Sequence, residues 1–265
     1  MEATKGVTSR PYMKSCFIAV LFIVASMFWL ETTAQSRSRK EGSADRAITQ
    51  QHYSRLQIPT KETWLAMVDS VYVDTLIMED KSSIRFSKAS VLIAEQAYIG
   101  EKCLLSSAGV DGRQLGESGE PGQNLSLVIV FKGLGSLVID TQGGDGKSGA
   151  KGSAGANGAS YQERGKPGGD GGNGGNAGAL RLFYAADGFQ PLFNGEGKGS
   201  IQLRYAGGRS GAGGEGGSGG KPIVPSSRGG SGTVCGTCPA APSGPRGNPG
   251  TPGLDGVLKL ERISH

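Results

Sequence analysis

Residues 168–176 have the sequence GGDGGNGGN, in which glycine occupies two of every three positions. The same arrangement recurs at residues 213–220, GGEGGSGG. A period of three is typical of an extended left-handed helix with three residues per turn, so each phase of the repeat forms one edge. Glycine on two edges lets neighbouring backbones approach on two sides. The third edge is expected to face solvent and carries Asp170, Asn173, Asn176, Glu215 and Ser218.

The period of three continues beyond these stretches. The chain has 47 glycines in 265 residues, and all but three lie between Gly109 and Gly256. Because glycine loses the most backbone freedom on ordering, the tracts must dock on one another and on β segments, stay disordered, or associate between chains as a triple helix. Collagen-like sequences have about 15–20% proline, whereas this chain has 12 prolines and interrupted runs. A bundle within one chain is therefore the first expectation.

Short β-type runs fill residues 70–108 and separate the glycine tracts further on. Leu180, Leu182 and Tyr184 fall on one face of such a run, opposite Arg181 and Phe183. This period of two indicates strands with one buried face. Hairpin signals of the Asn-Gly type are missing between the runs of 70–108, which favours strands that advance the chain stepwise. The sequence predicts an all-β fold with little α-helix, a β-solenoid of the parallel β-helix kind with an inserted polyglycine II helix bundle.

The first residues indicate export. Met13 and Lys14 precede an uncharged stretch, 16–30, which Thr32, Thr33 and Ala34 follow. This order is typical of a secretory signal, and the apolar run is short for a spanning helix. We expect residues 1–34 to be a signal peptide, or alternatively an N-terminal anchor, and the protein to be secreted or held in the cell envelope. The remaining predicted regions are a polar linker at 35–69, β-helix rungs at 70–108 and alternating β and Gly-x-y segments at 109–265.

Cysteine spacing agrees with an exported chain. Cys235 and Cys238 lie among Gly, Ser and Pro without a βα pattern, so a small loop disulfide is predicted rather than a redox motif. Cys103 lies in an apolar run and is expected to be a buried thiol. A zinc site needs about four ligands, and His52 and His265 lie far from the cysteines in sequence.

Motifs for catalysis and cofactors are weak. Residues 144–149 fit GxGxxG, but no helix-forming sequence follows, so no nucleotide is expected. Asp145 and Asp170 are calcium candidates with backbone carbonyls, and solvated edge residues are the simpler interpretation. The main prediction is therefore no enzyme and no cofactor. Paired carboxylates of a polysaccharide-acting β-helix enzyme remain a remote alternative, with Asp140 and Asp187 as the residues to test.

Two resemblances follow from these residues. Residues 70–108, especially 91–107, resemble the rungs of secreted parallel β-helix proteins. The Gly-x-y tracts from Gly109 to Gly256 resemble secreted bacterial collagen-like proteins, and they are more similar to the glycine-rich bundles of phage tail-fibre adhesin tips and of glycine-rich antifreeze proteins. The adhesin likeness implies that loops between glycine helices bind a surface receptor. The antifreeze likeness is incomplete, because the free edges here carry Lys147, Lys151, Asp170 and Glu215.

We therefore expect a structural or adhesive protein of the cell envelope or extracellular space. Its partner would be a glycan, a protein or another surface component, with self-association as a further expectation and no nucleic acid. The intermolecular, collagen-like trimeric fibre former is the alternative. The loop between residues 223 and 243 is the predicted recognition surface, with the candidate residues Ile223, Arg228, Thr233 and Thr237.

Overall fold

The computed structural model describes residues 49–158, 162–224, 232–234 and 236–264. These residues all belong to one compact unit, Ile48–His265. The predicted signal segment, 1–34, lies outside the described residues. Within the part of the chain that is described, no helix is long and apolar enough to cross a membrane.

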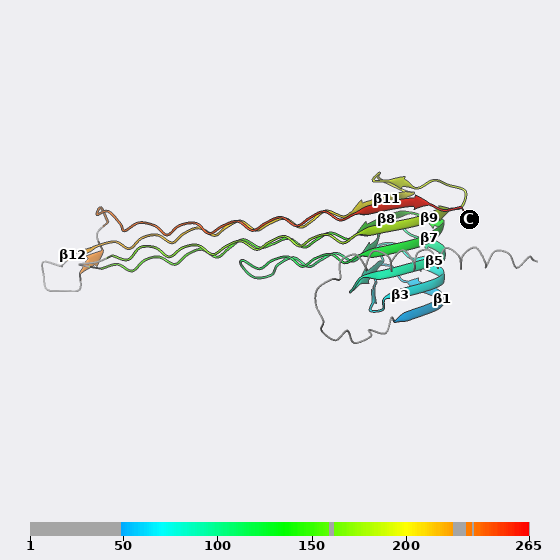
Figure 1. Ribbon diagram of the computed structural model, residues 1–265, viewed down its shortest axis with the longest axis horizontal. Coiled ribbons are helices and arrows are strands. Elements are labelled where there is room, and N and C mark those ends of the chain that lie inside the picture. Colours follow the sequence, from blue (N-terminus) through cyan, green and yellow to red (C-terminus); the bar gives the residue numbers. More distant parts are fainter. Residues whose placement is uncertain (1–48, 159–161, 225–231, 235, 265) are drawn as a thin grey trace, which may run out of the picture. The chain divides into compact units, whose positions relative to one another are not determined.

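Two six-stranded sheets make up the strand-rich part of this unit (Figure 1). The first sheet has the order β1 (Gln50–Ile58), β3 (Ser70–Met78), β5 (Ser90–Ile99), β7 (Leu125–Leu134), β9 (Leu180–Ala186) and β14 (Leu258–Arg262). The second has the order β10 (Leu192–Phe193), β11 (Ser200–Arg204), β8 (Ser136–Asp140), β6 (Cys103–Ser106), β4 (Ser83–Phe86) and β2 (Thr63–Ala66). Neighbouring strands pair in parallel throughout both sheets.

The predicted fold class needs correction. The described residues are all-β and contain no helix, but they form two open, parallel, six-stranded sheets and show no closed solenoid.

The predicted polar linker at 35–69 contains strands, because β1 begins at Gln50 and β2 at Thr63. The physical reason is that β1 is an edge strand with mostly exposed residues, so it lacks the alternating apolar pattern of a half-buried strand.

The core lies between inward-facing columns of apolar side chains. One column runs across four strands of the first sheet, from Val71 through Leu92 and Leu127 to Leu182, with each residue aligned with the next. All four are at most 1% exposed. A slip of one residue would turn the column outward, so this burial fixes the strand register. β7 is buried on both faces from Leu125 to Phe131, as its continuous apolar sequence requires.

The connections from the first sheet to the second repeat one backbone conformation, a lysine with positive φ. Lys61, Lys81 and Lys102 have φ values of 65°, 61° and 57° in three successive connections from the first sheet to the second. The amide of Lys61 donates to the carbonyl of Asp80 (3.1 Å), and the amide of Lys81 donates to that of Glu101 (2.7 Å). These bonds between successive corners offset the cost of a left-handed conformation, about 1–2 kcal/mol for a residue with a side chain.

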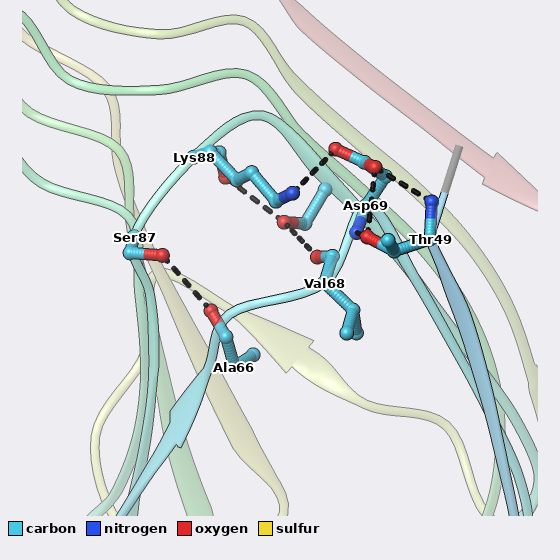
Figure 2. Close-up of polar contacts among 7 residues, drawn as sticks. Thr49, Ala66, Val68, Asp69, Ser87 and Lys88 are labelled. Carbon is cyan, nitrogen blue, oxygen red and sulfur yellow. Dashed lines mark hydrogen bonds and ion pairs between the residues drawn. The ribbon is translucent and has the colours of Figure 1, made fainter. Parts of the chain in front are cut away.

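The opposite corners are joined by side chains (Figure 2). Asp69 accepts hydrogen bonds from the amide of Thr49 (2.9 Å) and from its hydroxyl (3.0 Å), and it pairs with Lys88 at 2.9 Å. Ser87 donates to the carbonyl of Ala66 at 3.2 Å. The hydrogen bond from Lys88, and then that from the Thr49 amide, lower the pKa of Asp69 from 3.8 to about 2.

Glycine-rich segments leave the sheets and return to them (Figure 1). Each excursion starts after a strand of the second sheet and ends before a strand of the first, as between β8 and β9. We call the segments together the glycine-rich bundle, and its members are residues 109–122, 143–158, 165–178, 207–220 and 244–256. Extended chains with three residues per turn advance about 3.1 Å per residue, so residues 143–158 reach about 45–50 Å.

Backbone hydrogen bonds hold the bundle together at a period of three. Every third amide from Gly143 to Gly158 donates to a carbonyl of segment 207–220 or of the residue on either side of it. Gly149, for example, donates to Ala212 at 2.8 Å. Segment 165–178 donates from two of every three residues, and the two sets of amides face different neighbours. Gly168 donates to Pro245 of segment 244–256 (2.9 Å), and Gly169 donates to Ala150 of segment 143–158 (2.8 Å). Each inner segment thus meets several neighbours without any side chain between the backbones.

Candidate functional site

The exposed edges of the bundle are the first feature that a partner can meet. Asp170, Asn173 and Asn176 repeat every third residue and are exposed, as the glycine pattern predicts. Their side chains also bond inward. Asp170 accepts from the amide of Asn248 (2.7 Å), Asn173 from that of Thr251 (2.8 Å) and Asn176 from that of Leu254 (2.9 Å). This ladder fixes segment 244–256 against segment 165–178.

The glycine pattern alone predicts solvated edge residues at these positions and not this ladder. The repeated spacing of short amide and carboxylate side chains is the signal that indicates regular hydrogen-bond acceptors. Asx side chains are well suited to accept backbone hydrogen bonds. Asp145 shows the same behaviour with the amide of Arg209 (2.6 Å), and Asn157 with that of Lys221 (2.6 Å).

A small hairpin lies at the end of the bundle away from the sheets (Figure 1). It consists of β12 (Ile223–Val224) and β13 (Thr233–Val234), which pair antiparallel with Ile223 opposite Val234. The amide of Ile223 donates to the carbonyl of Gly158 at 3.0 Å, which ties the hairpin to the end of segment 143–158. Val224 and Val234 are 47% and 44% exposed.

The predicted recognition residues gather only in part. Ile223 and Thr233 lie on the two paired strands of the hairpin, and Thr237 is exposed a few residues further on. Arg228 lies outside the described residues. Cys238 is disulfide-bonded, but Cys235 also lies outside the described residues, so its pairing with Cys238 stays a prediction.

A polar cluster on the outer face of the first sheet was not predicted. His52 Nε2 lies 2.8 Å from Asp74 Oδ1, and the hydroxyl of Tyr72 donates to Glu95. The rings of His52 and Tyr72 lie 5.0 Å apart between centroids. Burial, and then the hydrogen bond to Glu95, raise the pKa of Tyr72 above its usual range, so Tyr72 stays a protonated donor. In the described part of the chain, no serine, threonine or cysteine side chain hydrogen-bonds to His52 or Asp74.

The acidic candidates have separate partners. Asp140 lies 4.0 Å from Arg204 and accepts from the amide of Gln142, whereas Asp187 pairs with Lys132 at 3.1 Å. The two carboxylates share no hydrogen bond in the described part of the chain. Oxygens of the calcium candidates Asp145 and Asp170 accept backbone amides. Among the described residues, no three His, Cys, Asp or Glu side chains group closely enough to hold a metal ion.

Cys103 is a free, buried thiol on β6. Its sulfur lies 3.7 Å from the Ser82 hydroxyl and 3.2 Å from the carbonyl of Glu79. Burial raises the pKa of this thiol. Because the thiolate is the reactive form of cysteine, Cys103 is suited to packing rather than to nucleophilic chemistry.

No protein-family model, curated protein or solved structure matches the chain. The geometry therefore carries the functional argument, and the end of the bundle with the hairpin β12–β13 is the candidate binding site.

Proposed function

We propose that this protein is an exported structural or adhesive protein that binds a component of a cell surface or envelope through the hairpin β12–β13. The observation that carries the proposal is the arrangement of the bundle. Its segments are held by regularly spaced backbone hydrogen bonds, and they hold the hairpin at their end away from the sheets (Figure 1).

The hairpin suits a binding role for two reasons. Its valines are about half exposed, which leaves apolar surface next to the exposed Thr233 and Thr237. Cys238, four residues after β13, is disulfide-bonded, and a covalent restraint next to the hairpin lowers the entropy lost when this region binds. A glycan or a protein of the cell surface is the expected partner class.

The bonding pattern of the bundle also bears on the fibre-forming alternative. A collagen-like trimer uses glycine amides between chains. Here the amides of Gly208, Gly211, Gly214 and Gly217 donate to segment 165–178 of the same chain. Those donors are therefore already used within one chain, which favours the adhesive proposal.

The test compares surface binding by the full chain and by two matched variants. Val224→Glu changes the hairpin at a residue that is 47% exposed, and Leu192→Glu makes the same kind of change on β10 at 56% exposure. Binding to a glycan array and to isolated cell envelopes is measured for each. We expect Val224→Glu to weaken binding about tenfold or more and Leu192→Glu to leave it unchanged.

Two results would overturn the proposal. One is equal binding by the Val224→Glu and Leu192→Glu proteins. The other is a trimer in light scattering whose mass falls to one third in a thermal melt, because that result identifies an intermolecular triple helix.

A further inference from the structure

The loop of residues 109–122 covers only part of the bundle. Its second arm bonds to two segments at once. The amides of Gly144 and Lys147 donate to the carbonyls of Glu120 and Glu117, both at 2.9 Å. In return, the amides of Gly119 and Gly122 donate to the carbonyls of Asn173 and Asn176, at 2.8 and 2.9 Å. The arm thus acts as an added strand between segments 143–158 and 165–178.

Segments 143–158 and 165–178 present further amides and carbonyls at the same period of three beyond the end of that loop. The next donors at the period of three are the amides of Ala150 and Ser153, and the next acceptors are the carbonyls of Asp170 and Pro167. None of these four groups has a hydrogen-bond partner within the described residues, and all four residues are exposed. Gly116, at the turn of the loop, lies against the carbonyl of Asp170, since a Cβ there would come within 2.9 Å of its oxygen. The open groups are therefore the amides of Ala150 and Ser153 and the carbonyl of Pro167. Segment 207–220 lies against the opposite side of the same two segments, because it bonds to Gly149 and to Gly169.

The surroundings of Gly169 show that another backbone has room to approach these unpaired groups. A Cβ on Gly172, Gly175 or Gly178 would overlap a carbonyl oxygen of the covering loop 109–122 or of the residue that follows it. A Cβ on Gly169, the next residue in the same phase, would meet nothing nearer than the amide nitrogen of Ala150 at 3.1 Å. Gly169 is exposed, so contacts within the chain require glycine at 169 less strictly than at 172.

We propose that this open track, formed by Ala150, Ser153, Pro167 and Gly169, binds an extended Gly-x-x segment of a different protein chain. The segment would continue the covering loop and add one more strand by backbone hydrogen bonding, as extended peptides add to open sheet edges. Glycine is needed at every third residue of the partner, because Gly119 and Gly122 of the loop already approach neighbouring carbonyls too closely for a Cβ.

Two observations indicate a different chain rather than a second copy. All five glycine-rich segments are bonded inside the bundle, so a second copy has none to donate without opening its own. The outermost segment, 244–256, carries Pro245, Pro249 and Pro252 at exposed positions. Proline has no amide proton, so this edge offers few donors to another copy.

Charge specifies the partner further. Lys147 and Lys166 are exposed on the two segments that border the open track. The covering loop has glutamates at the corresponding positions, 117 and 120, which bond through their backbone carbonyls. The carboxylate of Glu117 accepts the amides of Arg113 and Gln114 in its own loop, so it does not neutralise these lysines. A Gly-x-x segment with acidic residues therefore has the complementary charge, and a labelled (Gly-Glu-Ser)4-Gly peptide is a suitable probe.

The experiment measures binding of this probe to the full chain by fluorescence anisotropy. The variants are Ala150→Pro and Ser153→Pro, which remove an unpaired donor and place a ring in the track. The control is Ala212→Pro. Ala212 is also an exposed alanine after a glycine, and its amide has no partner among the described residues, but it lies on segment 207–220. Thermal melts confirm that all three variants are folded.

We expect the probe to bind the parent protein and the Ala212→Pro protein equally, and each track variant about tenfold more weakly, since a hydrogen bond and its register are lost. A peptide with alanine in place of every glycine should not bind. The proposal is overturned if the probe does not bind, if the alanine peptide binds as well, or if the track variants bind like the control. It is also overturned if the parent is a dimer that Ala150→Pro converts to a monomer, which identifies a second copy as the occupant.

Discussion

In the two sheets, fully buried side chains such as Leu76, Ile129 and Phe131 fill the space between strands, whereas the inner positions of the glycine-rich bundle carry no side chain at all. Burial of one large apolar side chain contributes about 1.5–3 kcal/mol. A net backbone hydrogen bond contributes about 0.5–1.5 kcal/mol, against about 1–2 kcal/mol for ordering a residue. The sheets can therefore order themselves, whereas the bundle depends on the close spacing of its backbones and on the strands at its base.

The largest expected effect comes from removing a side chain in the sheets. Phe131→Ala empties a fully buried site on β7. Such truncations cost about 3–5 kcal/mol, and the urea midpoint should fall accordingly. Leu192→Ala, at a residue that is 56% exposed, is the control and should change stability by less than about 0.5 kcal/mol. Equal midpoints for the two variants would contradict the picture of a core between the sheets.

The next largest effect comes from adding a side chain in the bundle. A Cβ on Gly214 would overlap the carbonyl oxygen of Ala150, and the Gly214 amide donates to Gly169 at 2.8 Å. Gly214→Ala should cost about 2 kcal/mol, within the range for overpacking. Hydrogen exchange should show lost protection at Gly211, Gly214 and Gly217, with β7 unchanged.

The control for that change is Gly236→Ala. A Cβ on Gly236 meets nothing within 4 Å. Alanine there should be neutral or stabilising by up to about 1 kcal/mol, because it lowers the conformational entropy of the unfolded chain. The opposite signs of the two substitutions separate packing from chain entropy. A Gly214→Ala protein as stable as the Gly236→Ala protein would show that the bundle backbones are not in close contact.

The sequence supported some of this organisation residue by residue. Glycines at 168–176 indicated two closely approached edges, and residues 170, 173 and 176 are indeed exposed. The period of two in residues 180–184 indicated a strand with a buried face, and Leu180 and Leu182 are fully buried in β9. These local features follow from chain geometry alone, so they were accessible without tertiary information.

Other features depended on contacts between distant residues. The predicted solenoid was wrong because strand periodicity does not specify how sheets close or stay open. β1 was missed because its exposed residues give no apolar alternation. The bond from Thr251 to Asn173 joins residues 78 positions apart, so the spacing indicates a regular acceptor at Asn173 but does not identify segment 244–256 as the donor. The recognition function of Ile223, Thr233 and Thr237 stays a prediction.

The smallest expected effect concerns the side chains that join the sheet corners. The hydrogen bond from Lys88 and those from Thr49 hold the pKa of Asp69 at about 2, below its ordinary value of 3.8. A carboxyl group whose pKa is lowered by folding contributes stability that is complete above its unfolded pKa and is lost as pH falls through the folded value. The contribution of Asp69 should therefore decline between about pH 4 and pH 2.

Asp69→Asn tests this because it removes the charge and keeps the shape of the side chain. Asp69 is 26% exposed and its partner Lys88 is 24% exposed, so solvent screens the pair and the loss at neutral pH should be about 1 kcal/mol. The difference in urea midpoint between the parent and the variant should shrink as the pH is lowered from about 4 to 2. Asp187→Asn is the control, because Asp187 is 68% exposed beside Lys132. A difference for Asp69→Asn that stayed constant over this range would mean that the corner is held by Thr49 and the strand backbones, and that its charge contributes nothing.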